Sequence, residues 1–459
     1  MLLRKLKKMN FHIEKLGIIK KADIELSDLT VICGKNNTGK TYVSYVTYGF
    51  LKTWENNIKF NPEQKQIKKL INDGILEIDL SDFEKDISTT LETSSKQYTS
   101  FIPKIFSANE DYFSGAKFRA LSTDYQANYY QHHVESQMSI GQKNVLKALK
   151  EKDSNILEIT LSTGNLPSSL VEDFLNRSLG TALLGDFFAN PFMITSERSG
   201  VSLFHRELDI NKNVLVERLQ GKKNLEHSDI FQMLDESVSR YARPIKEEID
   251  FVRDIVDVHS KNKSPLLKEH PELAKLLKDI VGGDYKVEGG QILFAFRKGR
   301  KVQRIPLYLA SSTVKSQLDI AFYLKHVAKK GDILLMDEPE QNLHPSNQRK
   351  MARLFVQLIK VGIKVLVTTH SDYLVKELNN LIILGNEFED RKKIMRKYGY
   401  TEEDVLEPTK IKVYIADKQT LVSAPINEMG ITVSSFDDEI HEMSDMFDDM
   451  TMTMEIAYD

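Results

Sequence analysis

The sequence is poor in cysteine, in net charge and in long apolar runs. Its 459 residues include one cysteine, Cys33, which excludes a disulfide framework and favours a reducing compartment. No apolar run reaches about 18 residues, so we expect no membrane span. The basic residues 1–8 have no apolar segment behind them, and we therefore predict no signal peptide and a cytoplasmic location. A net charge of −3 argues against a general nucleic-acid coat protein.

What the sequence does contain is typical of a folded protein with a large core. Hydrophobic residues make up 41% and charged residues 28%, and the length predicts two or three domains. In residues 1–55, apolar and polar residues alternate at 11–13 and 22–26, and a continuous apolar run follows at 29–33. These patterns predict strands, the last of them covered on both faces. An apolar, aromatic-rich segment follows at 42–54.

The character of the sequence changes after residue 55. Residues 56–280 carry many Lys and Glu, with helical spacing for example at 66–74 and 138–152, which predicts a mainly helical insertion with a strand at about 190–200 that returns to the sheet. A hairpin signal at 291–307 is followed by an expected helix at 315–329. A strand–helix–strand pattern over 333–368 then predicts a parallel α/β unit. We therefore divide the chain into domains at 1–55, 56–280, 281–385 and 386–459, the last being an acidic, Met-rich strand and helix extension.

A glycine-rich segment directly follows the apolar run at 29–33. It matches the pattern G-x-x-x-x-G-K-[ST], in which backbone N–H groups turn inward around phosphates. The pattern predicts that Lys40 reaches the β- and γ-phosphates of a nucleotide and that the Thr41 hydroxyl binds Mg²⁺. A strand before it and a helix after it favour a P-loop over a chance glycine turn. The predicted nucleotide-binding residues are Gly34, Lys35, Asn36, Asn37, Thr38, Gly39, Lys40 and Thr41.

Two later apolar runs end in polar side chains that suit phosphate chemistry. The run at 333–336 ends in Asp337 and Glu338. Asp337 is placed to hold the Mg²⁺ shell, and Glu338 to point at the γ-phosphate as a base or water-orienting group. The run at 365–369 ends in His370, which can donate to the γ-phosphate and sense its loss. The predicted catalytic residues are Glu338 and His370.

Together these motifs resemble a known family. The P-loop, the run D-E-P-E-Q-N-L-H-P at 337–345 and T-H-S at 369–371 look like the ABC-type ATPases of the SMC, RecF and OLD class. The D-E-P-E-x-N-L-H-P run is similar to the OLD-like branch of AAA-annotated ATPases. The resemblance covers 1–55 and 283–385, plus 196–200. It implies an α/β fold, namely an ABC-type P-loop ATPase head with a large, mainly α-helical insertion between the P-loop and the signature region.

The resemblance also assigns roles to single residues. It implies that Glu338 is the catalytic glutamate, that residues 342–344 form the D-loop and that His370 is the switch histidine. A signature motif from a second subunit should precede residue 333, and Ser312 stands where its serine is expected. Thr313 replaces one glycine of the usual L-S-G-G-Q pattern and the next residue, a valine, replaces the other, so we expect weak dimerisation or slow turnover. An ordinary N-cap is the alternative for this serine.

Three other features each allow two interpretations. Glu197 and Arg198 resemble the family's strand-end pair near the Q-loop, or form a buried structural pair, and the Q-loop glutamine has no assigned position. The basic residues 297–301 at the hairpin tip either touch a phosphate backbone or form a solvated turn. From residue 419 to 459 there is no Lys or Arg, but there are ten acids and six of the 14 Met residues. This tail either docks on a partner or packs as a final helix, because Ile440, Met443, Phe447 and Met450 have helical spacing.

The resemblance implies a slow, ATP- and Mg²⁺-dependent ATPase in which two heads sandwich two ATP molecules. Stand-alone chains of this kind are similar to the ATPase subunits of bacterial anti-phage systems such as PARIS and Septu. This implies a sensor or scaffold that holds a separately encoded effector, a nuclease or toxin, until a phage trigger protein arrives. The expected partners are a second copy, as a head-to-head homodimer or a higher oligomer, the effector and the trigger.

Two alternatives lie outside that reading. The main alternative is a DNA-repair ATPase of the SMC or RecF type that clamps DNA. The second is the nucleotide-binding subunit of a transporter, which the altered signature and the long insertion disfavour. After the last ATPase strand there is no paired-carboxylate motif on alternating strands, so we expect no intrinsic nuclease.

Overall fold

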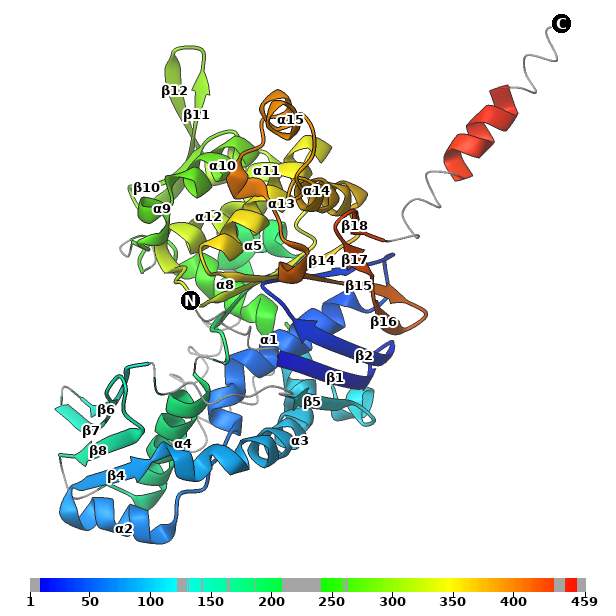
Figure 1. The fold of residues 1–459 in the computed structure, drawn as a ribbon. Helices are drawn as coiled ribbons and strands as arrows, with labels where there is room; N and C mark the ends of the chain where they lie inside the picture. The colour runs from blue at the N-terminus through cyan, green and yellow to red at the C-terminus, as the bar shows by residue number, and fades with distance from the viewer. Residues whose placement is uncertain are drawn as a thin grey trace, which may run out of the picture.

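A nine-stranded mixed sheet runs through the middle of the molecule, with helices on both of its faces (Figure 1). The computed structural model describes residues 9–121, 130, 132–141, 143–162, 166–185, 187–208, 241–258, 260, 263–432 and 442–451. In these ranges, no helix is both long and apolar enough to cross a membrane.

The sheet is parallel over one half, out to its edge, and mostly antiparallel over the other. From edge to edge its strands are β5 (Lys117–Leu121), β1 (Met9–Leu16), β2 (Ile19–Leu26), β16 (Thr420–Ser423), β15 (Ile411–Asp417), β3 (Leu29–Cys33), β14 (Lys364–Thr369), β13 (Ile333–Asp337) and β9 (Pro191–Ile194). The strands from β15 to β9 all run parallel. The carboxyl ends of β3, β13 and β14 therefore meet at one edge of the sheet, where ligands of α/β proteins bind.

Each face of the sheet covers its own hydrophobic core. Val31 of β3 packs into the core on one face and Ile32 into the core on the other. Leu334 and Leu335 of β13 divide in the same way. Because successive side chains of a strand point to opposite faces, a strand covered on both sides must be apolar throughout, which explains the continuous apolar runs at these positions.

On the side of the sheet that carries Ile32, the core contains helices from residues 40–184. They are α1 (Lys40–Asn57), α2 (Gln64–Asp73), α3 (Ile87–Phe106) and α4 (Ser168–Leu184). Figure 1 shows them below the sheet, beside a second, four-stranded antiparallel sheet. In spatial order that sheet consists of β4 (Ile75–Asp79), β8 (Ile156–Leu161), β7 (Lys143–Lys150) and β6 (Val134–Ile140). The described part of 56–280 therefore contains an antiparallel sheet in addition to the expected helices.

The helix expected over 138–152 is wrong. Residues in that range form the end of β6 and the whole of β7, which pair as an antiparallel hairpin. In β7, Leu146, Ala148 and Lys150 are buried and alternate with less buried residues, which is the two-residue period of a strand. Gly141 lies in the turn with a φ of 62°, a left-handed conformation that glycine adopts easily. The glycine at this position was therefore a sequence signal for a hairpin.

The other face is covered by helices from residue 198 onward. They are α5 (Arg198–Leu208), α8 (Arg243–Asp254), α9 (Leu266–Glu269), α10 (Pro271–Val281), α11 (Ser312–Ser316), α12 (Leu318–Phe322), α13 (Pro345–Lys360), α14 (Asp372–Ile383) and α15 (Arg391–Tyr398). The single helix expected over 315–329 is instead divided between α11, α12 and a π-helical turn, Tyr323–Val327.

Two small sheets complete the fold. The expected hairpin at 291–307 is present as β11 (Gln291–Lys298) and β12 (Lys301–Pro306), and β10 (Asp284–Glu288) pairs with β11. This hairpin projects from the body in Figure 1. Near the end of the described chain, β17 (Ile426–Asn427) pairs with β18 (Gly430–Ile431).

Candidate nucleotide-binding site

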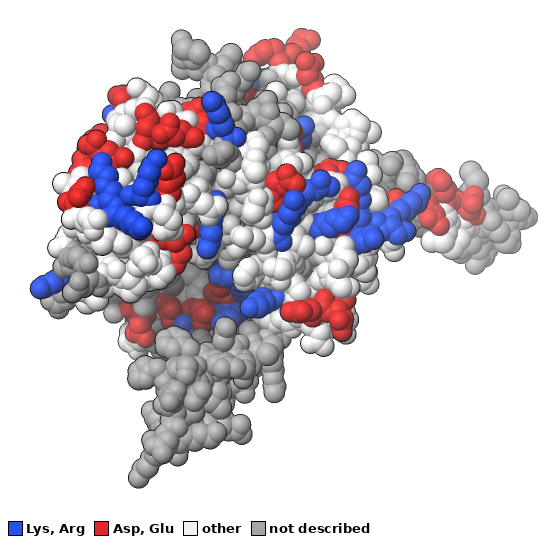
Figure 2. Space-filling model, turned by 90° about the horizontal axis from the view of Figure 1, so that it is seen from below, with Lys and Arg blue, Asp and Glu red and all other residues white. Residues whose placement is uncertain are grey.

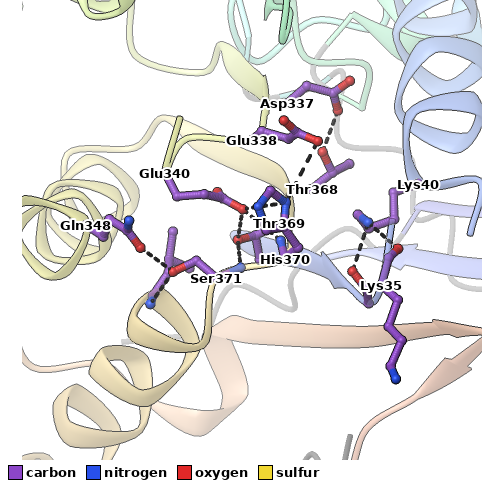
Figure 3. A network of polar contacts seen from close by, with 12 residues as sticks. Lys35, Lys40, Asp337, Glu338, Glu340, Gln348, Thr368, Thr369, His370 and Ser371 are labelled. Carbon is purple, nitrogen blue, oxygen red and sulfur yellow. Dashed lines mark hydrogen bonds and ion pairs between the residues drawn. The ribbon is translucent and has the colours of Figure 1, made fainter. Parts of the chain in front are cut away.

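The P-loop lies between the end of β3 and the start of α1. Gly34 has φ of 147°, and a Cβ atom there would lie 2.6 Å from the Ala416 carbonyl oxygen, so only glycine fits. The Lys40 ammonium donates to the carbonyl oxygens of Gly34 (2.9 Å) and Lys35 (2.8 Å), which closes the loop (Figure 3). Burial lowers the pKa of Lys40, and neighbouring carboxylates, chiefly that of Glu338, oppose this shift.

Asp337 is buried at the end of β13, opposite the start of α1. Its Oδ1 atom accepts hydrogen bonds from the hydroxyls of Ser44 (3.0 Å) and Thr368 (2.5 Å). Its Oδ2 atom has no hydrogen-bond partner among the described residues. Burial raises the pKa of Asp337 to about 6, against the hydrogen bonds from Thr368 and Ser44. A buried oxygen without a partner, near the Thr41 hydroxyl, fits the oxygen ligands that Mg²⁺ prefers.

Glu338 sits on an unusual backbone. Its φ is 47°, a left-handed conformation that costs a non-glycine residue free energy. Its N–H donates to the Thr368 carbonyl oxygen (3.0 Å). The side chain is 31% exposed, and its Oε1 atom lies 3.8 Å from Nδ1 of His370. The Glu338 carboxylate thus lies beside the His370 ring and near enough to the P-loop for its charge to act on Lys40.

His370 follows β14 and is held by a buried carboxylate. One oxygen of Glu340 accepts the backbone N–H of His370 (2.7 Å) and the Thr369 hydroxyl (2.8 Å), and it lies 3.3 Å from the His370 ring nitrogen Nδ1 (Figure 3). Glu340 is almost fully buried, whereas the His370 ring is 42% exposed. These contacts with Glu340 fix the orientation of the His370 ring and leave one side of the ring exposed to a ligand.

Arg198, at the start of α5, clamps the backbone that carries both acidic residues. Its fully buried guanidinium donates to the carbonyl oxygens of Asp337 (2.8 Å) and Glu338 (2.5 Å). Glu197 does not share this environment: it is exposed and accepts a hydrogen bond from the Tyr45 hydroxyl (3.3 Å). The alternative of a buried Glu197–Arg198 pair is therefore wrong, because the two side chains point to different surroundings.

Two buried carboxyl groups accompany the Arg198 guanidinium. Glu248 of α8 accepts hydrogen bonds from the backbone N–H (3.0 Å) and the hydroxyl (2.5 Å) of Thr195, and Asp319 of α12 is fully buried. Burial raises the pKa of Asp319 to about 7, although the charge of Arg198 opposes the shift. Burial and the proximity of Asp319 also raise the pKa of Glu248. Both carboxyls therefore favour the protonated form more than an exposed acid does.

Ser312 lies apart from this cluster. It is the exposed first residue of α11 and, in the part of the chain that the structure describes, it makes no hydrogen bond to the P-loop. The next residue, Thr313, donates to the carbonyl oxygen of Asn342 (2.6 Å). Asn342 has φ of 60° and donates to the Ser199 hydroxyl (3.0 Å). The segments expected as signature and D-loop are thus joined to each other on the surface.

The structure brings most of the predicted site residues to one place. The set consists of the P-loop from Gly34 to Thr41 together with Asp337, Glu338 and His370. Several contributors were not predicted: Ser44, Arg198 as a clamp, and Glu340. Ser44 lies one helical turn after Lys40 and so shares its face of α1, a signal that the sequence offered. Glu340 stands within the acidic motif itself, but nothing in its spacing indicates that it binds the histidine.

A comparison with protein families decides the class. The AAA ATPase domain family matches residues 5–375, most of the chain. The chain belongs to the AAA ATPase domain family. The match includes the P-loop, the acidic motif after β13 and the segment between them. For an AAA ATPase, a phosphate-binding P-loop and an adjacent magnesium site are the expected cofactor-binding features.

Among solved structures this AAA ATPase is similar to heads of SMC proteins. One is an SMC head bound to the C-winged helix domain of ScpA, with 12% identity and a TM-score of 0.33, covering 91% of this chain and 98% of that one. Another is the SMC head domain from Thermotoga maritima, with 12% identity and a TM-score of 0.31, covering 92% and 100%. A third, from Pyrococcus furiosus, is an SMC head with an extended coiled coil bound to the C-terminal domain of ScpA, with 14% identity, a TM-score of 0.31, and coverage of 95% and 99%. No curated protein matches the sequence.

Proposed function

We propose that this chain binds ATP with Mg²⁺ and hydrolyses it slowly at the P-loop site. One observation carries the proposal: two segments far apart in the sequence bring Lys40, the Asp337 oxygen without a partner and the Glu338 carboxylate near one another. Thr41 and Asp337 would hold the metal, which when bound neutralises phosphate charge. Lys40 would bind the β- and γ-phosphates, and Glu338 would orient or deprotonate the attacking water. His370, held by Glu340, would donate to the γ-phosphate.

The proposed working unit is a pair of heads. Ser312 is exposed and lies outside the site of its own chain, which supports a role at the γ-phosphate of a second copy. Residues 1–55 and 281–385 would form each head, and residues 386–459 its extension. ATP would close the two heads, hydrolysis would release them, and the insertion at 56–280 would carry the motion to a partner.

The cellular role that we propose is a cytoplasmic sensor or scaffold in anti-phage defence. In this role, the ATPase holds a separately encoded effector until a phage trigger protein arrives. Support comes from the resemblance of the motifs to the ATPase subunits of PARIS and Septu, and fold alone does not fix this role. We also propose that the nuclease or toxin activity lies in the effector.

The chemistry is tested by two substitutions. Lys40→Ala should abolish ATP binding, because it removes the phosphate ligand and the closure of the loop. Glu338→Gln should bind ATP as the wild type does but lose turnover by at least about a hundredfold, because the amide cannot take a proton. Isothermal titration and phosphate release measure the two effects, with Glu403→Gln as an exposed control. Normal turnover in Glu338→Gln would contradict the site assignment.

The cellular role is tested by an affinity pull-down. The Glu338→Gln variant is expressed with its neighbouring genes and held in ATP, and the eluate is analysed by mass spectrometry and by its absorbance ratio. A stoichiometric second protein without nucleic acid supports the effector scaffold and identifies the effector. DNA without a protein partner contradicts it.

The alternative function is a DNA clamp, and the β11–β12 hairpin is the feature that favours it. Four exposed cations at its tip have no ion-pair partner among the described residues, namely Arg297, Lys298, Arg300 and Lys301. Elsewhere the charge is mixed: on the face drawn in Figure 2, basic and acidic side chains alternate in small groups. Stimulation of the ATPase by DNA, with a steep dependence on salt, would favour the clamp over the scaffold.

A further inference from the structure

A helix near the end of the described chain presents an apolar face that no other described residue covers. It spans residues 442–451, and Figure 1 shows it (red) apart from the rest of the molecule. Four large apolar side chains recur at steps of three or four, the spacing of one helical face. They are between 52% and 67% exposed: Met443, Met446, Phe447 and Met450. Ile440, which the sequence pattern placed on the same face, lies outside the described residues.

The rest of this helix is acidic. It carries four carboxylates and no cation: Glu442, Asp445, Asp448 and Asp449. A helix of ten residues gains little stability in water by itself, and most of its stability comes from packing its apolar face. A surface that matches it must therefore offer apolar side chains flanked by positive charge.

The same chain carries such a surface at α15. Met395 is buried and anchors α15 to the body, while Ile394 and Tyr398, one turn apart, are exposed. Phe388, just before the helix, is also exposed and lines a hollow at the base of α15. Ile394 and Tyr398 form a short apolar strip on a helix whose sequence is otherwise basic, R-K-K-I-M-R-K-Y.

The cations of α15 are only partly neutralised. Arg391 binds both carboxylate oxygens of Glu402, at 2.7 Å each, and Lys393 lies 3.3 Å from Asp390. Lys397, beside the strip, has no ion-pair partner in the described part of the chain, and its ammonium lies 4.9 Å from the centre of the Tyr398 ring. Lys392 and Arg396 have no such partner either, but helical geometry places them on the side of α15 opposite Ile394 and Tyr398. The patch thus combines an apolar strip with unpaired positive charge, which complements the composition of the C-terminal helix.

We propose that the helix at 442–451 of one copy docks on α15 of a second copy. Met446 and Phe447 would cover Ile394 and Tyr398, and the acidic side chains would face Lys397. In a single chain the two surfaces lie apart and both are uncovered. Because every copy carries both halves, two copies related by a twofold axis form the contact twice, which is the isologous arrangement of most homodimers.

This contact is independent of the nucleotide site. Neither α15 nor the helix at 442–451 contributes a residue to the P-loop cluster. The contact therefore persists without ATP, and it keeps two heads at a high effective concentration for any interaction that needs both.

Cysteine cross-linking of the full chain tests the contact directly. Cys33 is fully buried, so an introduced cysteine is the accessible thiol. A chain with Ile394→Cys is mixed with a chain with Met446→Cys and treated with a short bismaleimide. We expect a covalent dimer of the two different chains on a denaturing gel. No dimer, or a cross-link to another protein alone, overturns the proposal. An intramolecular cross-link alone, in a chain that carries both cysteines, also overturns the proposal.

Charge reversal gives a second, independent measurement. Lys397→Glu should weaken self-association by about tenfold in sedimentation experiments, because it places a negative charge opposite the acidic helix. Adding Asp448→Lys should restore it. Lys68→Glu, on the exposed face of α2, is the matched control and should have no effect. Equal association of all four proteins overturns the proposal.

Discussion

At the scale of the residue, Glu338 shows how the fold prepares the proposed catalytic group. Its left-handed backbone costs about 1–3 kcal/mol for a side chain of this size. Two contacts to its own peptide groups stabilise that conformation: its N–H binds the carbonyl oxygen of Thr368, and its carbonyl oxygen accepts from Arg198. The acid is thus set in place by buried neighbours before any nucleotide arrives.

Arg198 should therefore affect turnover more than binding. We expect Arg198→Lys to lower ATP turnover at least about tenfold while changing ATP affinity little, because the ammonium cannot hold two carbonyl oxygens as the guanidinium fork does. Single-turnover hydrolysis and nucleotide titration separate the two effects, and thermal unfolding checks that the variant folds. Arg177→Lys, on an exposed part of α4, is the control. Equal losses of affinity and turnover would contradict a positioning role.

A substitution at Gly34 tests the steric requirement of the P-loop rather than its charge. A methyl group in Gly34→Ala would meet the Ala416 carbonyl oxygen at 2.6 Å on a backbone with φ of 147°. We expect the loop to shift and ATP affinity to fall by more than about tenfold. Gly200→Ala, where nothing lies within 4 Å of the added methyl group, should leave affinity unchanged. Unaltered nucleotide binding in Gly34→Ala would show that the loop is not the phosphate cradle.

The sequence predicted residues that belong to contiguous motifs and missed those that act across the fold. Lys40, Asp337 and His370 end or follow apolar runs, so strand geometry alone predicts that they meet. Arg198 is distant in sequence from the carbonyl groups that it binds, and nothing local indicates that its side chain turns inward. Glu340 was visible in its motif, yet its contact with the histidine depends on how the loop after β13 bends.

At the scale of the element, the buried group of Arg198, Glu248 and Asp319 joins three helices. These side chains come from α5, α8 and α12 and meet behind the end of β13. A buried cation that keeps two carboxyls near it ties the insertion helix α8 to the acidic motif. A movement of α8 would therefore shift Arg198 and, through its hydrogen bond, the backbone of Glu338.

The raised pKa of Asp319 makes this junction sensitive to pH. In the unfolded chain the carboxyl ionises near 3.8, whereas in the native protein it keeps its proton up to about 7. The protonated Asp319 carboxyl therefore makes its full contribution to the free energy of unfolding below about pH 4, and this contribution is lost as the pH rises through 7. In Asp319→Asn this loss is absent, so the variant should gain stability relative to the wild type between pH 5 and pH 8.

Denaturant unfolding at these two values of pH measures the effect. Asp279→Asn, an exposed acid of α10, serves as the control and should follow the wild type. Identical pH dependence of the wild type and Asp319→Asn would refute the assignment of the raised pKa to this side chain.

Elements were predictable where pattern and turn signals agreed. The hairpin at β11–β12 combines alternating residues with a glycine turn, and both signals indicate the same structure. At β6–β7 the short apolar spacings fit a helix or a strand, and only the partner strand β8 decides between them. Tertiary pairing, which a single sequence does not contain, determined the outcome there.

At the scale of the whole molecule, one core unites the first strands with the insertion. The ring of Phe50, on α1, packs against rings from β1, β5, α3 and the segment before β9, with centroids 5.0–5.6 Å apart: Phe11, Phe118, Tyr98 and Phe188. Since these elements bury one another, residues 9–55 and the described helical part of the insertion should unfold together.

The substitution Phe50→Ala tests whether these two parts of the chain unfold together. Loss of the ring should lower the free energy of unfolding by about 3–5 kcal/mol and leave a single, earlier transition in calorimetry. Phe101→Ala, an exposed position on α3, should change stability little. Two separate transitions, with only one of them shifted, would indicate an insertion that folds independently.

The position of β15 and β16 has a consequence for how the protein is made. Both strands come late in the chain, yet they lie between β2 and β3 and connect the two parts of the sheet. While the ribosome is still synthesising residues before 411, the edges of β2 and β3 have no neighbour, and exposed edges of this kind promote aggregation. Ala416, against which Gly34 of the P-loop packs, also arrives with these strands. The proposed phosphate cradle is therefore complete only after residues 411–423 have been synthesised, and until then the nascent chain leaves both strand edges exposed.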